Sequence, residues 1–376
     1  MAANNGKLIG LDISDTAVKL VEFSGVARKG GGIPDKLKIE HYAVASLPSG
    51  SVSEKNVVEP EAVGEAIAKV VRKAGTRTRR AAVAVGGSST ITKYINMPKG
   101  LTERQLEQQV EVEAEQHIPF PVEEVSLDFQ VLDQQPKDSD VVNVLLAAAR
   151  TEIVDAKVAA LEFGGIEAGV VDLEVFALEN ACSLLGHQLL RQSGDKPEKK
   201  SRGKSEPVMP HQVAVMDVGS STTSLTVLEN GRPVYTRDQQ FGGQALTEEI
   251  MERYGLTYEQ AGLAKKTGEL PEEGADYANE VLKPFMREMA HQVNRSIQLF
   301  QSAKSSALQM QQIILAGGCA AIKDIDRVVQ AETGIPTVIA DPFGKIAVAP
   351  KAMPQRLVGD APSLLIAAGL AMRAFD

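Results

Sequence analysis

The chain has 376 residues, 43% of them hydrophobic, which is enough to form the cores of about two domains. Its formal net charge of −9 argues against nucleic acid as a main partner, because nucleic-acid-binding surfaces are basic. The two cysteines, Cys182 and Cys319, lie in apolar surroundings and predict a reduced, cytoplasmic protein, and the five histidines show no metal-ligand spacing. We find no signal peptide and no uninterrupted apolar run of the ~18–20 residues that cross a membrane, so we expect any membrane role to go through a partner.

The first predicted element is a β-hairpin over residues 7–24. An apolar run ends at Asp12, a small polar turn follows, and the chain returns through Leu20 and Val21. Such a tip can present backbone N–H groups and hydroxyls to a phosphate, because nothing bulky blocks the approach. A carboxylate beside it can hold Mg²⁺ through water. Lys19, on the returning strand, is either a phosphate contact or a solvated strand residue.

The rest of the first half alternates strands and helices. The patterns predict a strand at 37–44, a loop at 46–58, an amphipathic helix at 60–74 and a buried strand at 81–85. Residues 91–139 differ, with short strands around an acidic helix from Leu101 to about His117, whose glutamates are typical of a solvated face. Strands at 141–148 and 166–172 and helices at 151–163 and 175–185 follow.

The second half opens with the same plan as the first. An apolar strand ends at Asp217, a small polar turn follows, and the strand resumes at Leu225. When Asp12 is laid on Asp217, the two hairpins align without a gap, which indicates two related lobes facing one ligand. Further on we expect a helix after Gly242-Gly243, a long helix at 276–306 bent or divided at Pro284, a strand ending at Gly317-Gly318, and helices at 322–333 and 363–372.

These patterns predict four parts of the chain. They are a first lobe of residues 1–90 and 140–190, an inserted small subdomain of residues 91–139, a flexible connection at 191–212 and a second lobe at 213–376.

Five segments, taken in order, resemble the actin-like ATPase superfamily. They are the two hairpin turns at 12–19 and 217–222, the helix that opens at Glu174, the double glycine at 317–322 and the small-residue helix at 361–370. Finer detail resembles one branch, the type IV pilus assembly family PilM, a relative of the division protein FtsA. The strings that carry this resemblance are Asp12-Ile13-Ser14 with Val18-Lys19-Leu20, residues 113–121 (EAEQHIPFP) and residues 360–376. FtsA-type proteins are expected to continue into a membrane helix beyond the position of Asp376, which favours the PilM branch.

The resemblance implies an α/β fold of the actin-like ATPase type, with two related lobes around a nucleotide cleft and a small α+β subdomain of the FtsA type. ATP would bind between the lobes, with Asp12 and Asp217 holding Mg²⁺ through water. Glu174 would orient the attacking water, unless it only caps its helix. The other residues expected at the nucleotide are Ser14, Asp15, Thr16, Lys19, Gly219, Ser220, Ser221, Thr222, Gly242, Gly243, Glu248, Lys265, Lys266, Gly317, Gly318 and Ala321.

Two further expectations concern these residues. For Glu248, Lys265 and Lys266, a position on the surface explains the residue nearly as well as a nucleotide contact does. Ser14 stands where the first turn of this superfamily usually has glycine, so we expect a conformational cost there and at most slow ATP hydrolysis.

The resemblance also implies a cytoplasmic, ATP-binding scaffold that is peripheral at the bacterial inner membrane. It would capture the N-terminal cytoplasmic segment of PilN in a groove near the first lobe and the inserted block, and self-association is left open. Two alternatives remain, a filament-forming protein like FtsA and a small-metabolite kinase. The kinase is disfavoured because no catalytic base beyond Glu174 is recognisable.

Overall fold

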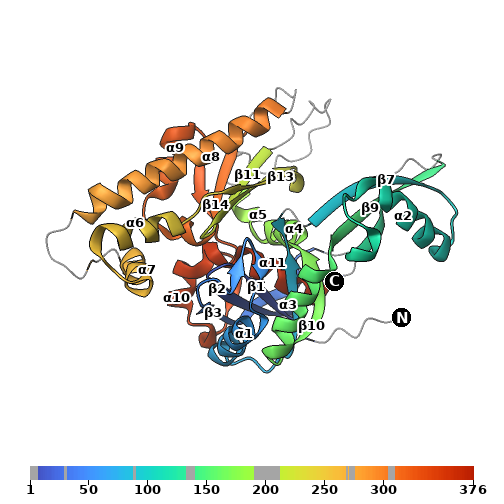
Figure 1. The fold of residues 1–376 in the computed structure, drawn as a ribbon, viewed down its shortest axis with the longest axis horizontal. Coiled ribbons are helices and arrows are strands. Elements are labelled where there is room, and N and C mark those ends of the chain that lie inside the picture. The colour runs from blue at the N-terminus through green and yellow to red at the C-terminus, as the bar shows by residue number, and fades with distance from the viewer. Residues whose placement is uncertain are drawn as a thin grey trace, which may run out of the picture.

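The computed structural model describes residues 7–28, 32–87, 90–132, 140–189, 212–267, 270, 276–303 and 310–376. Two lobes lie side by side, and a small subdomain projects from the first of them (Figure 1). The lobes contain a six-stranded and a five-stranded sheet, and the subdomain contains a three-stranded sheet. The predicted connection at 191–212 falls outside the described residues except for its last residue.

The sheet of the first lobe has the strand order β10-β6-β1-β2-β3-β16. Strands β1, β2 and β3 are antiparallel, and β6 and β10 run parallel to β1 on its other side. The strands are β1 (Ile9–Ile13), β2 (Ala17–Val26), β3 (Asp35–Ser46), β6 (Arg80–Val85), β10 (Glu167–Leu173) and β16 (Ala347–Val348).

The sheet of the second lobe repeats this arrangement, with the order β13-β12-β11-β14-β15. Three antiparallel strands again begin with a hairpin, and two parallel strands again flank its first strand. The strands are β11 (Gln212–Val218), β12 (Thr222–Glu229), β13 (Arg232–Gln240), β14 (Gln312–Ala316) and β15 (Thr337–Ile339). The internal similarity of the two hairpins therefore extends to whole sheets.

Helices cover the sheets in layers. Helices α1 (Pro60–Ala74) and α3 (Thr151–Phe163) pack on the first sheet. The second sheet is covered by α6 (Gln244–Tyr254), α7 (Tyr258–Thr267), α8 (Lys283–Ala303) and α9 (Ile325–Thr333). Helices α4 (Glu174–Leu184) and α11 (Leu365–Met372) contribute to a core shared by both sheets, and the short helices are α5 (Gly186–Leu189) and α10 (Pro354–Asp360).

Helix α11 lies at the centre of the molecule, and every one of its residues is buried. Two glycines permit its close packing: a Cβ on Gly10 would overlap the carbonyl oxygen of Ala367, and a Cβ on Gly369 would overlap that of Ala177. The stretch Pro354–Phe375 is long and apolar enough to cross a membrane by length and composition, although charged residues interrupt it. Here it serves as core, because α11 fills the space between β1 and α4.

The end of the chain belongs with the first lobe, which corrects the predicted boundary of a second lobe at 213–376. Strand β16 pairs with β3, and residues of α10 and α11 share a core with β2 and β3. Local sequence patterns do not reveal a pairing between strands about 300 residues apart, such as Ala347 with Lys38.

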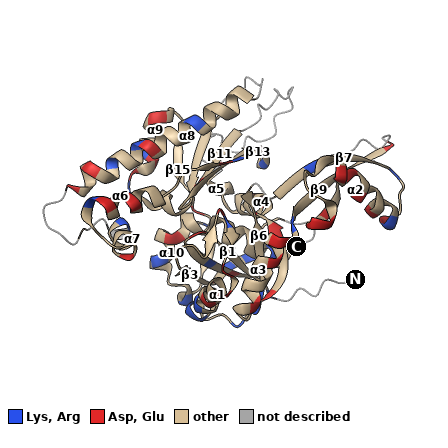
Figure 2. Cartoon of the chain, in the orientation of Figure 1, with Lys and Arg blue, Asp and Glu red and all other residues tan. Residues whose placement is uncertain are grey.

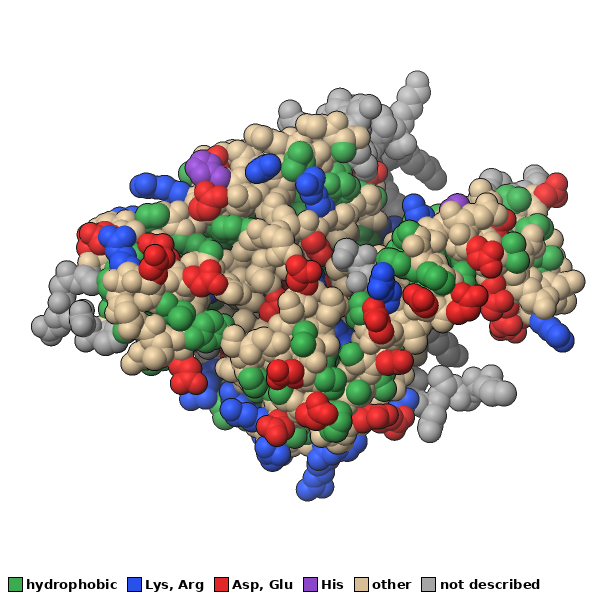
Figure 3. All heavy atoms as spheres, in the orientation of Figure 1, with side chains coloured by type: hydrophobic (Ala, Val, Ile, Leu, Met, Phe, Trp, Pro, Cys, Tyr) green, Lys and Arg blue, Asp and Glu red, His purple; other side chains and the backbone are tan. Residues whose placement is uncertain are grey.

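The inserted subdomain consists of one helix on a three-stranded sheet. Its strands are β7 (Thr90–Pro98), β8 (Val125–Leu132) and β9 (Val141–Arg150), with β9 in the centre, so β9 belongs here and not in the first lobe as predicted. Helix α2 (Glu103–His117) starts with a capping box between Thr102 and Gln105. Its acidic residues line the side away from the sheet (Figure 2), and the visible face of the subdomain is correspondingly acidic (Figure 3).

One local feature differs from expectation and another agrees with it. Residues 46–58 contain a small hairpin, β4 (Val52–Ser53) with β5 (Asn56–Val57), where we expected a loop. Its tip residues Glu54 and Lys55 both have positive φ. The long helix expected at 276–306 is divided, as predicted, because a π-helical turn at Ala278–Leu282 precedes α8, whose second residue is Pro284.

Candidate functional site

Two equivalent turns face each other between the lobes. Asp12 stands opposite Lys19 in the β1–β2 hairpin, and Asp217 stands opposite Ser224 in the β11–β12 hairpin. The same hydrogen bond closes both turns, from the Ser14 N–H to the Ala17 carbonyl (3.0 Å) and from the Gly219 N–H to the Thr222 carbonyl (2.9 Å). The structure thus brings the two predicted phosphate turns to one place.

In the first hairpin, Asp12 and Lys19 form an ion pair. The Lys19 Nζ lies 2.8 Å from the Asp12 Oδ2, and both side chains are largely buried. Burial alone would lower the pKa of Lys19, but Asp12, Asp217 and Glu174 outweigh it and raise the pKa above the ordinary value. Lys19 is therefore a buried, charged residue paired with Asp12 and not a solvated strand residue.

In the second hairpin, Asp217 has no ion-pair partner among the residues that the structure describes. Burial raises its pKa to about 6, against the opposing effect of Lys19 and Lys55, while Asp12 and Glu174 add to the rise. The Asp217 carboxylate also packs against Gly317, where a Cβ would overlap it. A half-buried carboxylate without a cation is suited to a divalent ion.

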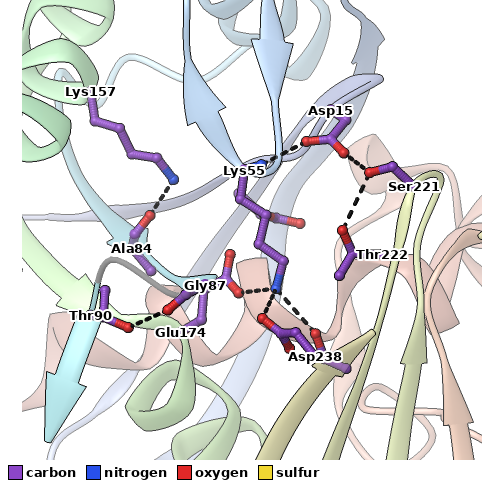
Figure 4. A network of polar contacts seen from close by, with 12 residues as sticks. Asp15, Lys55, Ala84, Gly87, Thr90, Lys157, Glu174, Ser221, Thr222 and Asp238 are labelled. Carbon is purple, nitrogen blue, oxygen red and sulfur yellow. Dashed lines mark hydrogen bonds and ion pairs between the residues drawn. The ribbon is translucent and has the colours of Figure 1, made fainter. Parts of the chain in front are cut away.

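Asp15 joins three segments of the site (Figure 4). Its Oδ2 accepts a hydrogen bond from the Ser221 hydroxyl of the second turn. Its Oδ1 accepts one from the backbone N–H of Lys55, at the tip of the β4–β5 hairpin (2.9 Å). Asp15 thus connects the first turn to the second lobe and to the β4–β5 hairpin.

Glu174 is the first residue of α4, but it does not cap the helix with its side chain. Its Oε2 lies 2.6 Å from the Nζ of Lys55. Lys55 also donates to the hydroxyl of Ser224 (3.1 Å) and lies 3.7 Å from the carboxylate of Asp238, both on the second lobe (Figure 4). Burial works against the charge on Lys55, but Glu174 and Asp238 prevail and raise its pKa well above the ordinary value.

Lys55, Ser224 and Asp238 were not among the predicted site residues. The tip Glu54-Lys55 contains no glycine, so the usual signal for a two-residue hairpin is missing. A single indication was available, because the valines at 52 and 57 bracket the tip symmetrically.

The expected cost at Ser14 is absent. Ser14 does not have positive φ, so serine fits the turn as readily as another residue would. Its hydroxyl donates to the Ala17 carbonyl (2.9 Å) and closes the turn a second time. Thr16, next in the turn, accepts a hydrogen bond at its carbonyl from the N–H of Leu47.

The Gly242-Gly243 segment packs on the second turn. The N–H of Gly243 donates to the Gly219 carbonyl (2.9 Å) and the N–H of Gln244 to that of Ser220 (2.7 Å), so these two groups are bonded to protein and not directed at a ligand. A Cβ on Gly242 would overlap Ser220, which explains the glycine.

Three other predicted residues lie around the start of α6. The Lys265 Nζ donates to the Gly243 carbonyl at 2.5 Å, next to Cys319. Glu248 is exposed and accepts from Gln244. The side chain of Lys266 lies outside the described residues.

The double glycine packs against the second turn. Gly317 has φ 85° and ψ 176°, a conformation that essentially only glycine adopts. A Cβ there would overlap the Val218 carbonyl, so the backbone after β14 approaches the second turn closely. A short 3₁₀ turn, Gly318–Ala321, follows, and its Gly318 and Ala321 are exposed.

These features fit a nucleotide with a divalent ion. The glycines at 242 and 317 leave no room for side chains, and small polar turns meet from both lobes. Carboxylates outnumber lysines, with Asp12, Asp15, Glu174, Asp217 and Asp238 against Lys19, Lys55 and Lys157. No cluster of three metal-ligating side chains occurs in the described part of the chain, so an ion would need ligands from water and phosphate as well.

A second site lies beside the cleft, in a groove of ≈ 450 Å³ between the first lobe and the inserted subdomain. The Arg150 guanidinium carbon lies 4.2 Å from the centre of the Phe120 ring. The Oδ1 of Asn56 is buried and has no hydrogen-bond partner in the described structure. The lining residues are Asn56, Val57, Phe120, Arg150, Glu152, Ile153 and Ala156.

Comparison with known proteins agrees with this architecture. A solved structure described as a PilM-PilN type IV pilus biogenesis complex contains a chain 27% identical to this one, covering 99% of both chains with a TM-score of 0.75. The ethanolamine utilization protein EutJ from Carboxydothermus hydrogenoformans is 16% identical, covers 98% of this chain and 90% of its own, and has a TM-score of 0.50. The fold is that of the actin-like ATPases. The family model for the type IV pilus assembly protein PilM matches residues 10–375, and the chain therefore belongs to that family.

Proposed function

We propose that this protein is an ATP-binding scaffold of the type IV pilus assembly platform that holds the N-terminal cytoplasmic segment of PilN. Membership of the PilM family supports the pilus role. The related chain in the PilM-PilN complex supports the partner. The groove beside Phe120 is the observation that carries the proposal, because it lies where the inserted subdomain meets the first lobe.

The groove has the features of a peptide site. Phe120 and Ile153 provide apolar surface, and the Arg150 guanidinium can donate hydrogen bonds to a carboxylate or carbonyl oxygen. Asn56 also lines the groove, and its side-chain amide can bond to the backbone of a peptide.

Nucleotide is assigned to the cleft between the two turns. ATP would lie with its phosphates between the turns, and Mg²⁺ would be held near Asp217 and Asp12 through water. Lys19 stays charged at any physiological pH, which suits a phosphate contact. The Oε2 of Glu174 is occupied by Lys55, so we expect ATP hydrolysis to be slow at most.

The proposed partner, PilN, also implies where this protein lies in the cell. A protein that holds the cytoplasmic segment of an inner-membrane component is peripheral at that membrane, on its cytoplasmic side. This placement needs no membrane-crossing segment of its own, and the apolar stretch at the end of the chain is used inside the fold.

The proposal is tested with a synthetic peptide of the N-terminal cytoplasmic segment of the cognate PilN. We expect saturable binding to the wild-type protein, weakened roughly tenfold or more by Phe120→Ala, since a central aromatic contact is lost. Tyr94→Ala is the matched control, because Tyr94 is an exposed aromatic residue of the same subdomain that does not line the groove. Fluorescence anisotropy gives both affinities.

Three outcomes contradict the proposal. They are absence of peptide binding with or without Mg-ATP, equal weakening by Tyr94→Ala and Phe120→Ala, and rapid phosphorylation of a small metabolite. ATP-dependent polymers that sediment without PilN would instead favour a filament-forming role.

A further inference from the structure

Lys55 occupies a backbone conformation that lysine rarely adopts. It has φ 68° and follows Glu54 with φ 49°, the geometry of a tight hairpin tip that favours Asn-Gly or Asp-Gly. Glycine would fit this position without strain. Strained residues of this kind persist where the surrounding contacts hold them, and they concentrate at functional sites.

The contacts that hold Lys55 come from both lobes. Its backbone N–H bonds to Asp15 and its Nζ to Glu174 on the first lobe, and the Nζ bonds to Ser224 on the second. Glu54 reaches the second lobe as well, through a bond from Gln240 (3.1 Å). The hairpin tip therefore bridges the cleft in which the two turns face each other (Figure 4).

The ammonium group of Lys55 has a donor available for a ligand. An ammonium carries three N–H donors. Two of them bond to Glu174 and Ser224, whereas Asp238 lies at 3.7 Å, beyond hydrogen-bond distance. Ser224 corresponds in register to Lys19 of the first hairpin. Lys55 bonds to this serine, so it adds its positive charge to that of Lys19 beside the second turn.

The residues that follow Lys55 belong to the other site. Asn56 and Val57 form strand β5 and line the groove between the first lobe and the inserted subdomain. Each strand of this hairpin has only two residues, so a movement of its tip displaces β5 as well. Lys55 in the cleft and Asn56 in the groove are joined by a single peptide bond.

We propose that Lys55 reads the terminal phosphate of the bound nucleotide and transmits its presence through Asn56 and Val57 to the peptide groove. The proposal rests on the proposed function for the identity of both ligands. A terminal phosphate competes with Glu174 and Asp238 for the ammonium, because all three are anions. This phosphate is the γ-phosphate of ATP, which ADP lacks, so the hairpin distinguishes ATP from ADP.

The first test compares nucleotide affinities by isothermal titration calorimetry in the presence of Mg²⁺. We expect Lys55→Gly to weaken ATP roughly tenfold or more while ADP changes by less than about threefold, since one charge-assisted bond is lost. Lys55→Met, which keeps the side-chain stem and the backbone conformation, should match it. Lys36→Gly is the control, because Lys36 is an exposed lysine that also has positive φ (55°), away from the cleft. An unchanged ratio of ATP to ADP affinity in both Lys55 variants would overturn the proposal.

The second test measures the affinity of the PilN peptide with and without Mg-ATP. In the wild-type protein ATP should change it about fivefold or more, a usual size for coupling between sites, and in Lys55→Gly by less than about twofold. Peptide binding that ATP does not alter in the wild-type protein overturns the transmission by Lys55 and leaves the proposed partner intact. Peptide binding that is absent throughout contradicts the proposed function instead, and the nucleotide ratio then decides the role of Lys55.

Discussion

The two hairpin turns at Asp12 and Asp217 have the same backbone geometry but differ in how their charges are balanced. Asp12 and Asp217 stand at equivalent register positions, and one hydrogen bond closes each turn in the same way. Asp12 has its own lysine opposite it, whereas Asp217 faces a serine. The first turn carries its own ion pair, whereas the second turn receives positive charge only from the other lobe, from Lys19 and Lys55.

This difference shows how a duplicated lobe can become dependent on its neighbour. The positive charge missing from the second hairpin is provided across the cleft, by an element that also borders the groove. The nearest cation to the second turn therefore moves with the first lobe. An assembly of this kind suits a protein whose nucleotide changes the relation between lobes more than one that turns nucleotide over rapidly.

The largest change in stability is expected at the first turn, where Asp12 is paired with Lys19. Asp12→Ala leaves the Lys19 ammonium buried without its ion-pair partner, which should cost about 3 kcal/mol in the free energy of unfolding. Urea denaturation measures it. Adding Lys19→Met to the variant should recover part of the lost stability, because neither charge then remains buried. A loss below about 1 kcal/mol in Asp12→Ala would contradict a stabilising Asp12–Lys19 pair.

At the second turn, removing the unpaired charge of Asp217 should raise the free energy of unfolding instead of lowering it. The folded pKa of Asp217, about 6, lies above its ordinary value of 3.8, so the stability that its protonated form contributes is present below about pH 4 and is lost as the pH rises through about 6. Asp217→Asn cannot ionise, so at pH 8 it should be more stable than the wild-type protein by up to about 3 kcal/mol, with little difference at pH 4.

This comparison is made by urea denaturation in EDTA, so that no divalent ion stabilises the carboxylate. A variant less stable than the wild-type protein at pH 8 would show that Asp217 is paired after all.

The smallest effect concerns the turns themselves. Ser14→Gly gives the first turn the glycine of the second, but it removes the hydroxyl bond to Ala17 and adds flexibility, for a loss of about 1 kcal/mol. The reverse change, Gly219→Ser, places a Cβ 3.0 Å from the Thr222 carbonyl and should also destabilise modestly. Thermal unfolding measures both, and a gain in stability from Ser14→Gly would indicate strain at Ser14.

Much of the fold could be predicted because its signals are local. The range expected for helix α1 matches its bounds, and the hairpins at Asp12 and Asp217 follow from apolar runs interrupted by small polar residues. Strand β16 and the return of the C-terminal segment to the first lobe could not be predicted, since they depend on pairing with β3 about 300 residues earlier. Tertiary packing, not local propensity, determines them.

The site residues that are glycines or small polar residues were predicted from the sequence. Lys55, which reaches the site from a distant segment, was missed. Glycines and small polar residues around Asp12, Asp217 and Gly317 mark close backbone approaches, which sequence shows directly. Lys55 carries no such mark, because it sits at positive φ without being glycine and its partners are remote in sequence. The inferred cost at Ser14 was wrong because the turn there does not need positive φ.

The central claim is that the two turns hold Mg-ATP between the lobes. Isothermal titration calorimetry of the wild-type protein and Asp217→Asn tests it most directly. The account predicts one Mg-ATP per wild-type chain and an affinity about 10- to 100-fold weaker in the variant, since Asp217 would orient the water around the ion. A wild-type protein that binds no Mg-ATP, or a variant that binds it equally well, would contradict the claim.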